Sequence, residues 1–96
     1  MKVIVLHEAM TELKDAQEYY DFERSGLGQS LVLEFNRAIH FISAFPNAWA
    51  QLRFGLKSYI LDRFPYKIIY RVDEQAIIVL AFAHQHQKPN YFWRRT

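Results

Sequence analysis

The sequence contains no cysteine, which excludes disulfide bonds and thiolate-bound zinc or iron–sulfur sites. It has only three glycines, and they do not form a phosphate-binding loop. The longest apolar run, Ala76 to Ala83, is eight residues long, whereas a membrane-spanning helix needs about 18. The apolar stretch Val3 to Leu6 is too short for a secretory signal. We therefore expect a cytoplasmic protein that does not enter the membrane.

Length and composition fit one folded domain. The chain has 96 residues, of which 51% are hydrophobic and 23% are charged, values close to the averages of globular domains. A single hydrophobic core usually takes about 100 to 150 residues. We therefore expect residues 1–96 to form one domain and exclude a two-domain enzyme.

Charge is distributed unevenly along the chain. Residues 1–50 carry four basic and seven acidic side chains, which gives a net charge of −3. Residues 51–96 carry eight basic and three acidic side chains, which gives +5. This asymmetry predicts that one surface binds phosphates or an acidic partner, while the other is an ordinary solvated face.

Two segments have helical periodicity. Apolar residues from Ala9 to Tyr20 recur every three or four positions, which predicts an amphipathic helix. The segment Ser25 to Gly28 reads as a turn, in which Gly26 suits the left-handed conformation that follows a helix. A second apolar stripe from Leu31 to Phe45 predicts a helix that Pro46 ends. Two helices with so short a connection should pack as an antiparallel hairpin.

The remaining segments read as strands. Val3 to Leu6 is apolar and partly β-branched, which predicts a strand covered on both faces. Leu56 to Leu61, Lys67 to Val72 and Ala76 to Ala83 predict a three-strand meander, with Asp73 to Gln75 as the last tight connection. The order β-α-α-β-β-β indicates an α+β fold, in which a helical hairpin packs on one face of a small, mostly antiparallel sheet.

Alternation along the Lys67 strand predicts where its cations point. Tyr66, Ile68, Tyr70 and Val72 form the apolar face, which should pack on the helices. If the other face is open, Lys67 and Arg71 project from it as a basic platform. Lys57 joins them if the preceding strand pairs in a compatible register, and a one-residue slip reverses the assignment.

Few residues fit a standard catalytic site. Of the four histidines, only His84 and His86 are close in sequence, and no third ligand completes a metal site. Phosphodiester cleavage needs a base, an acid and positive charge at the phosphate. His84 or His86 with Tyr91, among arginines and lysines, can supply all three. The alternative is that the cations protect a sheet edge from aggregation and the tyrosines belong to the core.

The segment Lys88 to Arg95 places three aromatic residues among three cations. Aromatic and arginine side chains together are typical of binding hot spots and of stacking on unpaired bases. The alternative is that Trp93 closes the core.

Three stretches together resemble a known family, the RelE/ParE superfamily of type II toxin–antitoxin toxins, and more closely its ParE, or plasmid-stabilisation, branch. They cover nearly the whole chain. The stretches are Ala9 to Tyr20 with Glu12-Leu13 and Tyr19-Tyr20, followed by Gly26-Leu27-Gly28 and Phe35; Arg63 to Val72; and Ile78 to His84 with Pro89 and Tyr91 to Trp93.

The resemblance implies a small α+β toxin, without a cofactor or a metal, that a cognate acidic antitoxin wraps and holds inactive. ParE-like members poison DNA gyrase, whereas RelE-like members cut messenger RNA in the ribosomal A site. The oligomer implied is either a homodimer or a toxin–antitoxin hetero-oligomer.

Two sets of site residues follow from the resemblance. A RelE-like mRNA endonuclease implies catalytic roles for Lys67, Arg71, His84 and Tyr91. A ParE-like toxin implies a target-binding surface made of Arg63, Phe64, Pro65, Tyr66, His86, Lys88 and Trp93. The segment Gln85 to Lys88 carries one lysine where the family is rich in arginine, so a degenerate toxin that retains only antitoxin binding is a third alternative.

Overall fold

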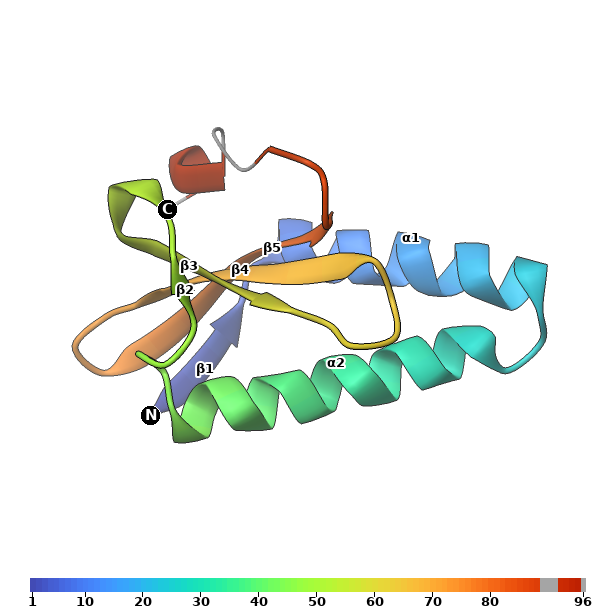
Figure 1. Ribbon diagram of the computed structural model, residues 1–96, viewed down its shortest axis with the longest axis horizontal. Helices are drawn as coiled ribbons and strands as arrows, with labels where there is room; N and C mark the ends of the chain where they lie inside the picture. Colours follow the sequence, from blue (N-terminus) through green and yellow to red (C-terminus); the bar gives the residue numbers. More distant parts are fainter. Residues whose placement is uncertain (89–91, 96) are drawn as a thin grey trace.

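The computed structural model describes residues 1–88 and 92–95. Two helices and five strands follow one another in the order β1-α1-α2-β2-β3-β4-β5 (Figure 1), with a short 3₁₀ turn before β3 and another after β5. Their bounds are β1 Lys2–Val5, α1 His7–Glu23, α2 Leu27–Ala44, β2 Ala50–Gln51, η1 Arg53–Gly55, β3 Leu56–Ile60, β4 Tyr66–Val72, β5 Ala76–His84 and η2 Phe92–Arg95.

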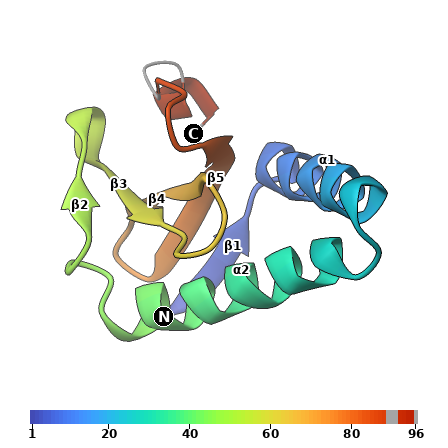
Figure 2. The ribbon, with the colours of Figure 1, turned by 45° about the vertical axis from the view of Figure 1, so that its right-hand side comes forward.

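The strands form one mixed sheet in the order β1-β5-β4-β3-β2. β1 runs parallel to β5, and the other neighbouring pairs are antiparallel. Figure 2 shows α2 on one side of the sheet and η2 on the other. The predicted α+β class and its element order are confirmed, and β2, η1 and η2 are additional elements that periodicity did not predict.

β1 is an edge strand, and the prediction that it is covered on both faces is wrong. Among the described strands it pairs only with β5, in a register that sets Val3 opposite Ile77 and Val5 opposite Val79. Val3 and Val5 pack against the main core, whereas Ile4, which points the other way, is 36% exposed. A continuous apolar run therefore does not guarantee cover on both faces of a strand.

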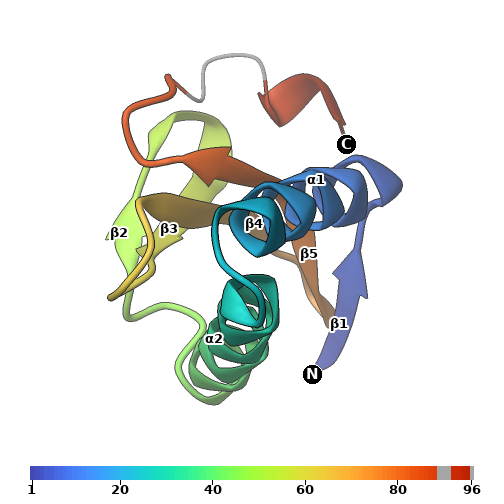
Figure 3. The same cartoon turned by 90° about the vertical axis from the view of Figure 1, so that its right-hand side faces the viewer.

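The helical hairpin has a close crossing at its turn. Gly26 adopts the left-handed conformation with φ of 88°, as the sequence predicts. α2 begins at Leu27, so Gly28 lies inside its first turn instead of in the connection. A Cβ atom on Gly28 would lie 2.7 Å from Cγ of Asp21, whose carboxylate accepts the Gly28 N–H at 2.8 Å. Figure 3 shows the two helices side by side beside the sheet.

The sheet buries a hydrophobic cluster on each face. The main core packs residues of both helices, such as Leu13 and Phe35, against the face of β4 and β5 that carries Ile68 and Phe82. A second cluster lies on the opposite face and includes Phe92 of η2. The described residues include no helix long and apolar enough to cross a membrane.

Candidate functional site

Lys67 and Arg71 lie on the same face of the sheet, as alternation along β4 predicts. Tyr70 and Ile68 belong to the main core, while Ile69, which stands between the two cations on the other face, belongs to the second cluster. Lys67 is opposite Ala83, and Arg71 is opposite Ile78. We call this face, turned away from the helices, the outer face of the sheet.

The outer face is not the open basic platform that the sequence suggested, because η2 covers its centre. Phe92 is completely buried in a cluster with Leu56, Ile69, Leu80 and other residues of the outer face. Ile69 is itself completely buried. Ile69, an apolar residue between the two cations, would lie open to solvent without Phe92 of the C-terminal turn, which packs in the same cluster.

The polar ends of Lys67 and Arg71 bond to their own chain. The Lys67 ammonium donates to the carbonyl oxygens of Gln85 at 3.1 Å and of Gln87 at 2.7 Å, so it holds the turn that follows β5. Burial lowers the pKa of Lys67. The Arg71 guanidinium lies 3.4 Å from the carboxylate of Asp73. The hydrogen bond from the Glu74 backbone N–H, followed by that from Arg71, lowers the pKa of the Asp73 carboxyl.

Lys57 does not join these two cations. It lies opposite Tyr70, and directly paired residues of antiparallel strands share a face. Tyr70 is a core residue on the helix side, so Lys57 also points to the helix side. The register of β3 against β4 thus excludes the platform of Lys57, Lys67 and Arg71 that a different pairing would have produced.

His84 lies on the helix side of the sheet, away from the face of Lys67 and Arg71. It pairs with Tyr66, and the two rings pack edge-on at 5.7 Å between centroids. The His86 ring lies 5.6 Å from the His84 ring. The predicted catalytic set is therefore divided between two faces, and its fourth member, Tyr91, is outside the described residues.

A shallow groove of about 330 Å³ runs between α1 and the ends of β4 and β5 beside His84. Burial raises the pKa of Tyr66 at its wall, and Tyr19 adds to the shift. The groove carries carboxylates, tyrosines and one imidazole. Its lining residues are Glu12, Asp15, Ala16, Tyr19, Tyr66, Phe82, His84 and Gln87.

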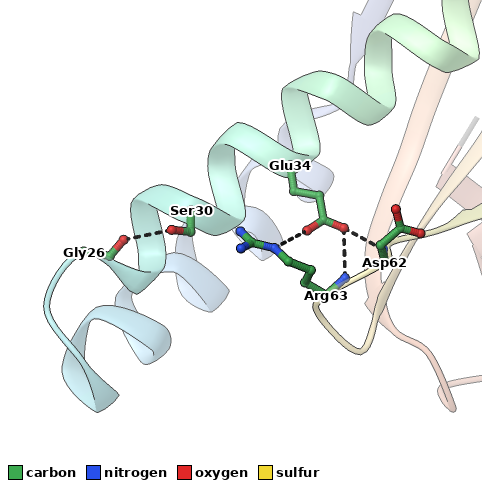
Figure 4. A network of polar contacts seen from close by, with 5 residues as sticks. All are labelled: Gly26, Ser30, Glu34, Asp62 and Arg63. Atoms are coloured by element: carbon green, nitrogen blue, oxygen red, sulfur yellow. Dashed lines mark hydrogen bonds and ion pairs between the residues drawn. The ribbon is translucent and has the colours of Figure 1, made fainter.

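The loop between β3 and β4 is bound to α2 by Glu34 (Figure 4). One oxygen of the Glu34 carboxylate accepts the backbone N–H groups of Asp62 at 2.6 Å and of Arg63 at 3.1 Å, and the other accepts Nε of Arg63 at 3.4 Å. Phe64 is only 6% exposed, so this predicted contact residue belongs to the core. Arg63 and Pro65 are exposed on the loop.

Glu12 joins α1, β5 and η2. Its carboxylate accepts the Phe82 N–H at 3.0 Å and forms a bidentate ion pair with Arg95, with N–O distances of 3.0 and 2.9 Å. Arg95 also donates to the Leu80 carbonyl at 2.9 Å. Leu80 is the extra residue of a β-bulge, since Ile69 pairs with Ala81 and Tyr70 with Val79. The clasp formed by Glu12 and Arg95 therefore supplies partners to backbone groups beside the bulge.

The C-terminal turn exposes Trp93 and buries Phe92. The alternative in which Trp93 closes the core is wrong, because its side chain is 39% exposed while Phe92 is completely buried. The Trp93 ring lies 5.1 Å from the ring of Phe54 in η1, which sequence analysis did not single out. Lys88 is exposed on the segment before η2. Among the described residues, no group of three or more histidine or carboxylate side chains can hold a metal ion.

A helical hairpin against a five-stranded mixed sheet is the ParE-like fold. One similar solved structure is the chromosomal ParDE TA system from P. aeruginosa, with a TM-score of 0.78 and 17% identity over 88% of this chain and 95% of that chain. At that identity the likeness shows the fold alone. A family model described as the ParE toxin of the type II toxin–antitoxin system parDE matches residues 3–89. This chain belongs to that ParE toxin family. A search of curated proteins gave no match.

Proposed function

We propose that this ParE-family chain is the toxin of a type II toxin–antitoxin pair, and that it acts in the cytoplasm by binding and poisoning DNA gyrase. The observation that carries the proposal is the separation of Lys67 from His84. Lys67 bonds to backbone carbonyls on the outer face, while His84 packs against Tyr66 on the helix side. Phosphodiester cleavage needs its acid, base and cation around one phosphate, so this arrangement favours binding over catalysis.

A gyrase supercoiling assay tests this proposal. Purified chain should inhibit supercoiling and convert plasmid to the cleaved linear form, and the control reaction without gyrase should leave the plasmid intact. A negative result at micromolar protein would remove the gyrase target. Five of the predicted contact residues are exposed: Arg63, Pro65, His86, Lys88 and Trp93. Arg63 and Pro65, which share the β3–β4 loop, are the first positions for substitution.

The alternative is a RelE-like, ribosome-dependent mRNA endonuclease. The shared face of Lys67 and Arg71 is the observation that favours it. Primer extension on translated mRNA should then show codon-positioned breaks, which a Lys67→Ala, Arg71→Ala double variant should abolish. If neither gyrase inhibition nor mRNA cleavage occurs while antitoxin binding persists, the chain is a degenerate toxin.

We also propose that an acidic, partly disordered antitoxin neutralises the chain by laying a helix or strand across the helical hairpin and the sheet edge. The free edge of β1 offers backbone groups for strand addition. Leu33 and Phe41 of α2 are 58% and 44% exposed, and Phe45, which directly follows the helix, is 62% exposed. These three side chains offer apolar anchors. Added salt should weaken the complex, and an affinity independent of ionic strength would contradict a charge-led interface.

A further inference from the structure

Four planar side chains from two distant segments meet beside the outer face of the sheet. We call them the aromatic–arginine patch: Arg53 and Phe54 of η1, and Trp93 and Arg94 of η2. The rings of Phe54 and Trp93 lie 5.1 Å apart at a tilt of 34°. The Arg53 guanidinium lies 5.2 Å from the Phe54 ring, and the Arg94 guanidinium lies 5.4 Å from the Trp93 ring.

The fold holds this patch in place from below. Leu56, which follows η1, and Phe92, which opens η2, are buried in the same cluster on the outer face. A backbone hydrogen bond of 2.7 Å from Leu52 to Leu56 closes the η1 turn. Both halves of the patch therefore stand on one packed base, which limits how far they can move apart.

The backbone conformation of Phe54 is energetically unfavourable for a residue with a bulky side chain. Its φ of 62° lies in the left-handed region, where a bulky side chain is an outlier and glycine is the usual residue. Its side chain is nevertheless 57% exposed, so it contributes little to the core. A strained backbone that presents an exposed aromatic ring is typical of a binding position.

The two arginines of the patch keep their charge available. Within the described part of the chain, Arg63, Arg71 and Arg95 each pair with a carboxylate, but Arg53 and Arg94 do not. A ligand for this surface therefore has to be anionic and has to offer planar faces to two exposed rings.

We propose that the aromatic–arginine patch binds unpaired nucleotides of a single-stranded nucleic acid, with bases stacked on Phe54 and Trp93 and phosphates beside Arg53 and Arg94. Stacking tolerates any base, because every base has a π-face. An acidic peptide would satisfy the two cations, but its carboxylate side chains offer no π-face to the exposed rings. This inference goes beyond the proposed gyrase poisoning and does not depend on which target the toxin has.

Trp93 itself reports on the binding. A Trp49→Phe background leaves Trp93 as the sole tryptophan, and Trp49 makes no hydrogen bond through its indole nitrogen that the change would break. An oligothymidylate of about ten nucleotides should quench Trp93 fluorescence with saturation. The matching duplex and an oligoglutamate of equal charge should bind more weakly.

Substitutions in the patch separate stacking from charge. Phe54→Ala should weaken binding by about 5- to 100-fold, which corresponds to the loss of one stacking ring. Arg94→Gln should reduce the slope of log affinity against log salt by about 0.7, the value for one phosphate contact with a single strand. The matched control is Arg24→Gln, which removes one charge at the α1–α2 connection, at the other end of the long axis (Figure 1), and should leave the slope unchanged.

The inference would be overturned if the oligothymidylate caused no saturable quenching, or if both patch variants bound it as tightly as the parent chain. It would also be overturned if the duplex bound as tightly as the oligothymidylate. Equal affinity for the oligoglutamate would overturn it too, and would make an acidic protein segment the occupant. Circular dichroism of the variants verifies that they are folded. Gyrase inhibition by a chain that does not bind the oligonucleotide would refute this inference and leave the proposed function standing.

Discussion

Replacing Glu12 with alanine should destabilise the fold by about 2–4 kcal/mol. The Phe82 N–H loses its acceptor, which costs about 1–3 kcal/mol. Arg95 loses its ion-pair partner, and breaking a fully buried pair in this way costs about 3–5 kcal/mol. The Arg95 and Glu12 side chains are 16% and 28% exposed, so water recovers part of that loss, as does the bond from Arg95 to the Leu80 carbonyl.

Urea unfolding followed by circular dichroism measures this effect. Domains typically have a free energy of unfolding of about 5–15 kcal/mol, so the expected loss is a large part of the total. In a thermal melt the same loss should lower the melting temperature by about 10 °C or more. Glu12→Gln keeps an acceptor for the Phe82 N–H and should cost less. The control, Glu18→Ala, removes an exposed carboxylate of α1 and should change stability by less than about 0.5 kcal/mol.

A double-mutant cycle with Arg95→Ala isolates the ion pair and should give a coupling energy of about 1 kcal/mol or more. If Glu12→Ala costs no more than Glu18→Ala, or if the coupling is near zero, the clasp does not stabilise the protein and the reasoning is refuted.

Three further predictions concern other parts of the fold. Glu34→Ala should cost about 1–3 kcal/mol in a urea titration, because two loop N–H groups lose their acceptor; Arg63→Ala should cost less than about 1 kcal/mol, because that side chain is 67% exposed. Burial raises the pKa of Tyr70 to about 12 from the ordinary 10.0, so this group's contribution to stability falls as the pH rises from 10.0 to 12. Tyr70→Phe should cost about 0.5–1.5 kcal/mol below that range and lessen the decline within it, and urea midpoints that decline equally in both proteins would contradict the assignment. Gly28→Ala should lower the melting temperature, because its Cβ would lie 2.7 Å from Cγ of Asp21; an unchanged melting temperature would mean that the helices separate without cost.

The elements of the fold could be predicted from the sequence because their signals are local. The apolar stripes of both helices, the left-handed Gly26 and the tight connection after Asp73 all depend on residues a few positions apart. β2 and η1 carried no such signal, since a two-residue strand has no period. The exposure of Ile4 was not predictable, because it depends on which strand lies at the edge.

The candidate site was harder to predict, because it depends on pairing between distant segments. Alternation correctly placed Lys67 and Arg71 on one face, but it could not show that Phe92 covers the strip between them. The position of Lys57 required the register of β3 against β4. The contact between Phe54 and Trp93 joins two loops without periodicity, and no pattern in either segment indicates the other.

Two contacts join early segments of the chain to late ones. β1 pairs with residues 76–79 of β5, and Glu12 bonds to Arg95, which is 83 positions further along the chain. A growing polypeptide cannot make either bond until those late residues have left the ribosome, although the helical hairpin can form much earlier. A nascent chain interrupted before Arg95 therefore lacks its clasp, so the fold cannot be completed until Arg95 has emerged.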